Sequence, residues 1–258
     1  MKNIIFFNIS FNIIYILLYN MNNYICNEKY YTTDKQEFEI TDNINKIFVT
    51  NNIKLTKIII NNSKIRNIHI ENCPNLIKIK CIYDNIHTMT ITNCMKLNKL
   101  PKNITNIINL KIKYTNINTI PNNLNKIECL LLDNCPIKEI PKELTPLREL
   151  KINNCFITEI PNELINLINL YIYNCEHLNK LSNNLNIHQL ILKNCNNVVK
   201  IPTYDNMNYL VLVNCRNIGI IPDYSKINDI YIKNCLKLRD IVKSYYYNEN
   251  YYINFFGN

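Results

Sequence analysis

Residues 147–164 read LRELKINNCFITEIPNEL, and this stretch decides the fold. Its pattern is L-x-x-L-x-I-x-x-C-x-I-x-x-I-P-x-x-L, in which Leu150 and Ile152 alternate with polar residues. Alternation with a period of two is expected of a short strand that buries one face. Pro161 follows the next apolar residue, where a missing backbone amide is harmless in an irregular segment. The stretch therefore predicts one short strand followed by a turn and an extended return.

The same frame recurs along the chain at a fixed interval. Eight cysteines each follow an asparagine, and the steps between them are 21, 41 and then 20 five times. The step of 41 spans two units, and the middle ladder position is a threonine. The structural ladder is Cys73, Cys94, Thr115, Cys135, Cys155, Cys175, Cys195, Cys215 and Cys235. With one more unit around Asn52, ten units cover residues 44–245, and a period of about 20 residues indicates a solenoid.

This pattern closely resembles the leucine-rich repeat, L-x-x-L-x-L-x-x-N/C-x-L. The resemblance implies an α/β-type repeat solenoid, a curved horseshoe with a parallel concave β-sheet. Units of this length leave no room for a long helix, so we expect an extended or 3₁₀ convex side and almost no α-helix. The predicted order is a hydrophobic leader over 1–25, an N-terminal cap over 26–43, the repeats over 44–245 and an aromatic C-terminal cap over 246–258. Asparagine and isoleucine make up well over a third of the residues, a bias typical of AT-rich genomes such as those of parasites or large DNA viruses.

The ladder cysteines are expected to be buried, because cysteine is a small residue that is often fully inside. A metal site or disulfides are the alternatives. The chain has no C-x-x-C pair and four histidines, which disfavours zinc. Side chains at equivalent positions of parallel strands point alike, which makes disulfide geometry hard to reach. We therefore expect free thiols, preceded by a column of asparagine amides that hydrogen-bond along the solenoid.

Composition excludes most catalytic classes. Only Gly219 and Gly257 are glycines, so the glycine-rich phosphate loops and dinucleotide fingerprints cannot be present. None of the five serines lies in a G-x-S-x-G setting. The net charge of +9 is spread as single lysines, without the clustered run expected of a nucleic-acid stripe. We expect no enzyme, no cofactor, no metal, no nucleic acid and no small-molecule substrate.

The ends of the chain differ from the repeats. Residues 4–19 are mostly apolar after Lys2, which is typical of a secretory signal or an uncleaved anchor, the one feature that would bring the chain to a membrane. The alternative is a hydrophobic cap that packs on the first repeat. The leader predicts a secreted or membrane-associated protein, with a cytoplasmic location as the alternative. Tyrosines and phenylalanines over 245–256 are expected to cover the last repeat as a lid.

Residues that flank the two buried strand positions should point out of the concave sheet. In the C-terminal half they combine aromatic and aliphatic side chains with lysines, a composition that marks interaction sites. The predicted partner-binding residues are Tyr171, Tyr173, Ile191, Lys193, Tyr209, Val211, Val213, Tyr231 and Lys233. The alternative is that an isoleucine-rich composition places β-formers in strands indiscriminately. Equivalent positions of the N-terminal half are mostly polar, such as Thr90 and Lys111.

The leading interpretation is a non-enzymatic scaffold whose concave face binds another protein, and which could be a secreted or surface factor that interacts with a host. Two alternatives remain open. One is an intracellular substrate-recognition adaptor of a ubiquitin-ligase-type assembly. The other is a structural surface or wall protein.

Overall fold

The structure is a computed structural model that describes residues 28–31, 34–221 and 227–238. Within these residues the chain forms two parallel sheets and a single 3₁₀ turn, η2 (Leu236–Leu238). The strands of the larger sheet, here the main sheet, are β1 (Glu28–Tyr31), β3 (Lys46–Thr50), β5 (Asn67–Glu71), β7 (Thr88–Cys94), β8 (Asn109–Thr115), β9 (Cys129–Asp133), β10 (Glu149–Asn153), β11 (Asn169–Tyr173), β12 (Gln189–Lys193), β13 (Tyr209–Val213) and β14 (Asp229–Lys233). The smaller sheet, here the second sheet, contains β2 (Glu37–Ile40), β4 (Lys57–Ile60) and β6 (Lys78–Cys81).

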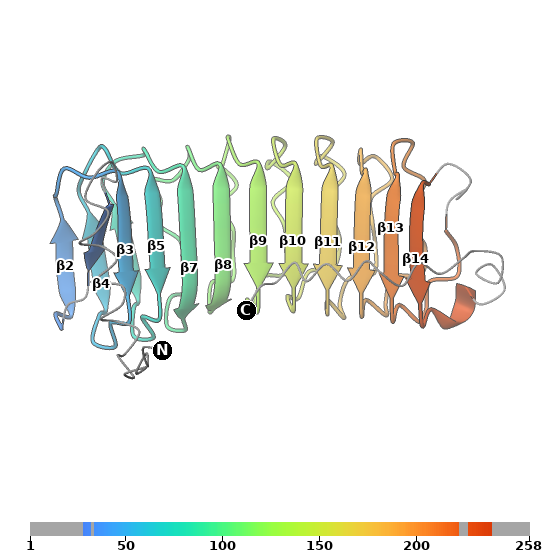
Figure 1. The fold of residues 1–258 in the computed structure, drawn as a ribbon, viewed down its shortest axis with the longest axis horizontal. Coiled ribbons are helices and arrows are strands. Elements are labelled where there is room, and N and C mark those ends of the chain that lie inside the picture. The colour runs from blue at the N-terminus through green and yellow to red at the C-terminus, as the bar shows by residue number, and fades with distance from the viewer. Residues whose placement is uncertain (1–27, 32–33, 222–226, 239–258) are drawn as a thin grey trace, which may run out of the picture.

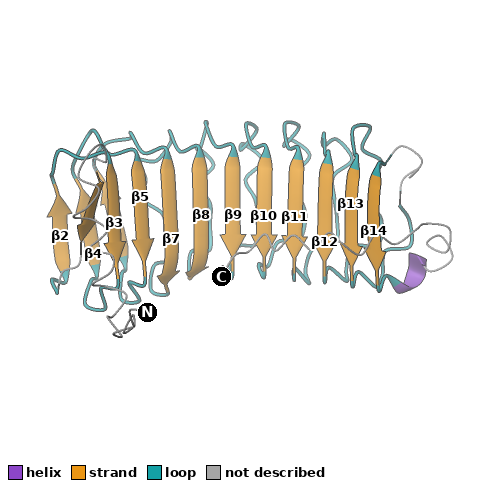
Figure 2. Cartoon of the chain, in the orientation of Figure 1, coloured by secondary structure: helices purple, strands orange, loops and turns teal. Residues whose placement is uncertain are grey.

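The main sheet keeps one register from repeat to repeat. Leu150 of β10 pairs with Leu130 on one side and with Leu170 on the other, so each residue meets its counterpart 20 positions away. Figure 1 shows the resulting row, with β3, β5, β7 and then β8 to β14 side by side in chain order, and Figure 2 shows loops connecting one strand to the next. The predicted fold class, a parallel-sheet repeat solenoid with almost no helix, is confirmed.

The core is the interior of the solenoid. The second and fourth positions of each main-sheet strand from β3 to β13 are apolar and at most 2% exposed, as Leu150 and Ile152 illustrate. The segments that lead from the end of one main-sheet strand to the start of the next, here the return segments, cover these side chains from the other side. Ile157 and Leu164 are examples of return-segment residues that are fully buried. Each turn of the solenoid thus buries apolar side chains against its two neighbours, which is the general source of stability in repeat proteins.

The second sheet was not predicted, because the convex side was expected to be extended or 3₁₀. Phe38 and Ile40 of β2 alternate with exposed glutamates, and β4 and β6 repeat this alternation in register. From Pro101 onward most return segments carry a proline. Proline cannot donate to a sheet ladder, and within the described residues this side continues only as the isolated bridges Glu159–Lys180 and Lys200–Ile220.

The segment assigned to the N-terminal cap contributes a strand to each sheet. Strand β1 pairs with β3 and β2 pairs with β4, both in parallel. These strands extend the row beyond the first predicted repeat. The leader over 1–25 and the aromatic cap over 246–258 lie outside the described residues. In the described part of the chain no helix is long and apolar enough to span a membrane.

A sharp bend lies at the C-terminal end of every repeat strand, just after it or in its last residues. Among the residues that the structure describes, ten non-glycine residues have a positive φ, between 48° and 57°, and all occupy the position before the ladder residue or, in the first repeat, before Asn52. They are Asn51, Asn72, Asn93, Tyr114, Asn134, Asn154, Asn174, Asn194, Asn214 and Asn234. Asparagine tolerates this left-handed conformation better than most residues. This backbone requirement is a second reason, beyond the predicted amide column, for an asparagine at nine of ten positions.

Candidate functional site

The ladder residues lie inside the solenoid, where each strand turns into its return segment. All eight ladder cysteines and Thr115 are at most 5% exposed, and the cysteines are free thiols. Each thiol donates to the carbonyl two residues earlier, as Cys175 does to Tyr173 at 3.3 Å. Burial raises the pKa of Cys175 to about 11 and that of Cys195 to about 12. At neutral pH the thiols of Cys175 and Cys195 are therefore protonated and poor nucleophiles.

The amides of the preceding asparagines bond to one another across repeats, as the sequence predicts. Donor and acceptor are 2.6–2.9 Å apart in pairs such as Asn72–Asn51 and Asn214–Asn194. One hydrogen bond departs from this pattern: the Asn174 amide donates to Asn153 at 2.7 Å, instead of to the column residue Asn154 next to it. The column links successive repeats along the edge of the main sheet. Its asparagine amides form neither a nucleophilic site nor a metal site.

The predicted binding residues do share one surface. We call it the open face, meaning the side of the main sheet formed by the first, third and fifth residue of each strand. Register aligns Tyr171, Ile191, Val211 and Tyr231 as one column. It aligns Tyr173, Lys193, Val213 and Lys233 as a second column, with Tyr209 at the first position of β13. The nine residues therefore form one continuous patch over β11 to β14.

Two members of this patch are far less accessible than expected. Tyr171 is 3% exposed and Ile191 is 7% exposed, because their neighbours on the same face cover them. The Tyr171 hydroxyl donates to Gln189 Oε1 at 2.8 Å, and the Lys151 ammonium lies over its ring at 5.1 Å from the centroid. Burial raises the pKa of both Tyr171 and Tyr173 to about 12. The accessible part of the patch is formed by Tyr173, Tyr209, Tyr231 and the lysines and valines, all half-buried.

A second aromatic cluster was missed in the N-terminal half of the open face. Tyr30 and Phe48 stack with ring centroids 4.4 Å apart and planes 4° from parallel, and the His69 ring lies 5.5 Å from Phe48. His69 Nε2 is also 3.2 Å from a carboxylate oxygen of Glu71. Phe48 stands at the same strand position as Tyr171, so its place in the repeat could have identified it. Tyr30 could not be placed, because its strand precedes the recognisable repeats.

Lysines occupy the middle of the open face. Register aligns Lys111, Leu131 and Lys151 in the third position of β8, β9 and β10. Asp133 lies beside them, only 3% exposed, and accepts hydrogen bonds of 2.7 Å from the amides of Asn134 and Asn153. Along the solenoid, the open face thus carries aromatic side chains first, then basic side chains, and finally the mixed aromatic and aliphatic patch.

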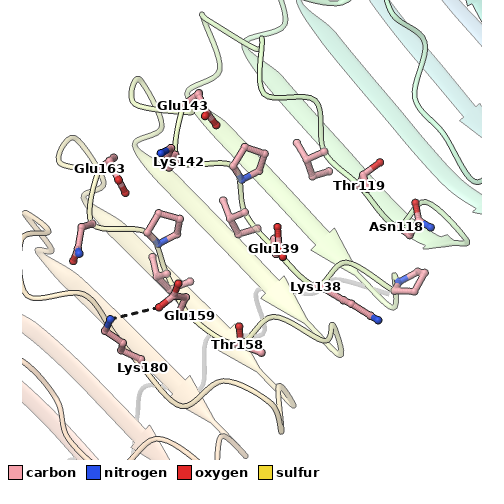
Figure 3. A pocket seen from close by; sticks show the side chains of 17 residues that line it. Asn118, Thr119, Lys138, Glu139, Lys142, Glu143, Thr158, Glu159, Glu163 and Lys180 are labelled. Atoms are coloured by element: carbon pink, nitrogen blue, oxygen red, sulfur yellow. Dashed lines mark ion pairs between the residues drawn. The ribbon is translucent and has the colours of Figure 1, made fainter.

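A groove of about 830 Å³ lies on the return-segment side of the solenoid (Figure 3). Residues of four successive repeats line it, with buried Ile120, Ile140 and Ile160 among them and exposed charges around them. Glu159 and Lys180 form a 3.5 Å ion pair there, with both side chains more than half exposed. Lysines and glutamates are mixed along the groove, and no cluster that could hold a metal ion occurs among the residues that the structure describes.

Comparison with known proteins gives structural likeness only. No family model and no curated protein matches the chain. The leucine-rich repeat domain of the type III effector XCV3220 (XopL) is similar over 77% of this chain and 74% of that domain, at 15% identity and a TM-score of 0.43. The functional domain of InlJ from Listeria monocytogenes, which includes a cysteine ladder, is similar over 76% of this chain and 58% of its own length, at 14% identity and a TM-score of 0.44. A leucine-rich repeat protein of Leptospira interrogans, LIC12759, is similar over 74% of this chain and 78% of its own, at 14% identity and a TM-score of 0.28. The fold described above therefore rests on the repeat pattern and on the sheet itself.

Proposed function

We propose that the chain is a binding scaffold that holds another protein on the open face of its main sheet and catalyses no reaction. The observation that carries this proposal is the open face itself. Eleven strands in register, spaced about 4.8 Å apart, make a rigid surface about 48 Å long. A surface of this kind binds with little ordering cost, since its backbone is already fixed.

The patch over β11 to β14 is the part of this face that we propose as the main contact. Tyr173, Tyr209 and Tyr231 stand on three strands, each half-buried, with valines between them. Tyrosine combines a large apolar ring with a polar hydroxyl, and it is enriched among the residues that dominate binding energy. The dimensions of the face suit a protein segment better than a small metabolite.

The test replaces Tyr173, Tyr209 and Tyr231 together with alanine and compares protein capture from cell lysates by quantitative mass spectrometry. We expect the captured protein to fall at least about tenfold, because each anchor of this kind contributes more than about 1 kcal/mol. The matched control replaces Ile165, Val199 and Ile220, which are 56–58% exposed and lie off the open face. Circular dichroism checks that both variants are folded. Equal capture by the tyrosine variant and the wild type would place binding elsewhere.

A further inference from the structure

Nearby carboxylates pair with some of the lysines in the middle of the open face but not with all of them. Lys151 Nζ lies 2.9 Å from Glu149, and Lys113 Nζ lies 3.7 Å from Asp133. Lys111 is more exposed than Lys113 and Lys151, although still partly covered, and it forms no ion pair with any residue that the structure describes. The open face therefore carries an ammonium group that its own carboxylates leave without a partner.

The neighbours of Lys111 make this charge unfavourable in the free protein. Partial burial, followed by the nearby charge of Lys113, holds the pKa of Lys111 below its usual range, and Lys151 acts in the same direction. Asp133 and Glu71 act the opposite way without reversing the result. An incoming carboxylate would offset the repulsion among the three ammonium groups. Its gain would be larger than at an isolated surface lysine, because the site is partly desolvated.

We propose that the partner bound on the open face is an acidic protein segment, which places a carboxylate against Lys111 and an apolar side chain over Leu131. This inference rests on the proposed function and names the chemistry of the partner. Lys111 and Lys151 are two strand spacings apart, about 10 Å. An extended peptide covers that distance in about three residues. A segment that crosses the strands can therefore place an acidic residue against Lys111 and an apolar residue, one or two positions further along its chain, over Leu131, with the tyrosine patch as the next contact.

The same surface fits a nucleic acid poorly. No arginine occupies the first, third or fifth position of any described main-sheet strand. Asp133, Glu149 and Glu71 lie among the lysines, where they would repel a continuous phosphate backbone. A peptide meets less of this conflict, because its carboxylates stand on flexible side chains that can turn away from these three groups while one of them pairs with Lys111.

The experiment measures binding of fluorescein-labelled poly-L-glutamate to the purified full-length chain by fluorescence anisotropy. An ionic strength of about 0.01 M keeps the Debye length near 30 Å, so that weak charge contacts are visible. Lys111→Glu should weaken binding at least about tenfold, as expected for reversing a central charge contact. Lys111→Gln should weaken it less. The matched control is Lys138→Glu, which makes the same change in net charge in the groove on the other side.

Three results would overturn the inference: no binding of poly-L-glutamate by the wild type, an equal loss in Lys111→Glu and Lys138→Glu, or equally tight Lys111-dependent binding of labelled poly-uridylate. The last would mark a nucleic-acid surface. The outcome is separable from that of the proposed function. If the tyrosine variant loses its captured protein while Lys111→Glu still binds poly-L-glutamate normally, the scaffold stands and the acidic partner is wrong. If instead the tyrosine variant keeps its captured protein while Lys111→Glu loses poly-L-glutamate, the open face binds acidic chains without the tyrosine patch.

Discussion

The side-chain amide of Asn153 donates a 2.7 Å hydrogen bond to the carboxylate of Asp133 one repeat earlier. The same carboxylate oxygen accepts from Asn134, and Asp133 is 3% exposed. The substitution Asp133→Ala removes this carboxylate and should lower the free energy of unfolding by about 2 kcal/mol, because the amides of Asn134 and Asn153 lose a charged acceptor. Urea denaturation measures the change. Asp205→Ala, at an exposed position, should stay within about 0.5 kcal/mol of the wild type. Equal effects of the two substitutions would show that the buried carboxylate of Asp133 does not stabilise the fold.

Tyr114 is the one member of the bend column that is not asparagine, and it holds a φ of 49° with its side chain 44% exposed. Tyr114→Asn should raise the free energy of unfolding by about 1 kcal/mol, since asparagine tolerates the left-handed conformation and little packing is lost. Tyr83 is 45% exposed without a positive φ, so Tyr83→Asn serves as the control and should not stabilise. Loss of stability in Tyr114→Asn would mean that the tyrosine ring makes a contact more valuable than the strain it causes.

The two roles of the asparagine column can be separated at Asn214. Its amide donates to Asn194 at 2.7 Å and its oxygen accepts from Asn234 at 2.9 Å, while its φ is 56°. Asn214→Gly removes both hydrogen bonds and keeps the backbone relaxed, whereas Asn214→Ala removes the bonds and adds strain. We expect the alanine variant to be less stable than the glycine variant by about 1 kcal/mol. Identical urea midpoints would assign the role to the amide alone.

Cys155 is 2% exposed, and its role is expected to be packing. Cys155→Ala should lower the free energy of unfolding by about 1–3 kcal/mol through lost packing, without affecting capture of a partner. Cys155→Lys should prevent folding, since it buries an unpaired charge between repeats. Native thiols should react slowly with a disulfide reagent and rapidly in urea. Reaction of all ladder thiols within seconds in the native protein would contradict the buried assignment.

Stability should fall at alkaline pH. Burial raises the pKa of Cys175 to about 11 and of Cys195 to about 12, from an ordinary value of 9.0. A raised pKa in the folded state means that the stabilisation is complete below pH 9 and is lost as the pH rises towards 11–12. Urea midpoints at pH 7, 9 and 10.5 measure the loss. The double variant Cys175→Ala/Cys195→Ala should lose less between pH 9 and 10.5 than the wild type, and an identical slope would exclude these thiols as the cause.

The sequence predicted the main sheet because its pattern is strictly periodic. Leu150 and Ile152 alternate as a strand must, and their counterparts recur every 20 or 21 residues, so both the strands and their register followed. Accessibility was harder to predict. Tyr171 was placed on the correct face, yet its burial depends on Gln189 and Lys151 of neighbouring strands, which the pattern of a single repeat does not reveal.

Departures from the repeat account for the other differences. Strand β1 pairs with β3 although Lys29 and Tyr31 stand where the later strands have aliphatic residues, so it could not be recognised as part of the array. The left-handed bend was missed for a different reason. An asparagine is compatible with both a side-chain ladder and a positive φ, and the sequence alone does not separate the two.

The constant register also bears on how the chain reaches its fold. Each main-sheet strand from β3 onward finds its partner about 20 residues away in a chain of 258, a ratio of about 0.08. Among small domains, local pairings go with faster folding, whereas sheet proteins with distant pairings need milliseconds to seconds. A chain that is almost entirely parallel sheet thus avoids the loop-closure cost that usually slows such sheets, because every strand can assemble on the one made just before it.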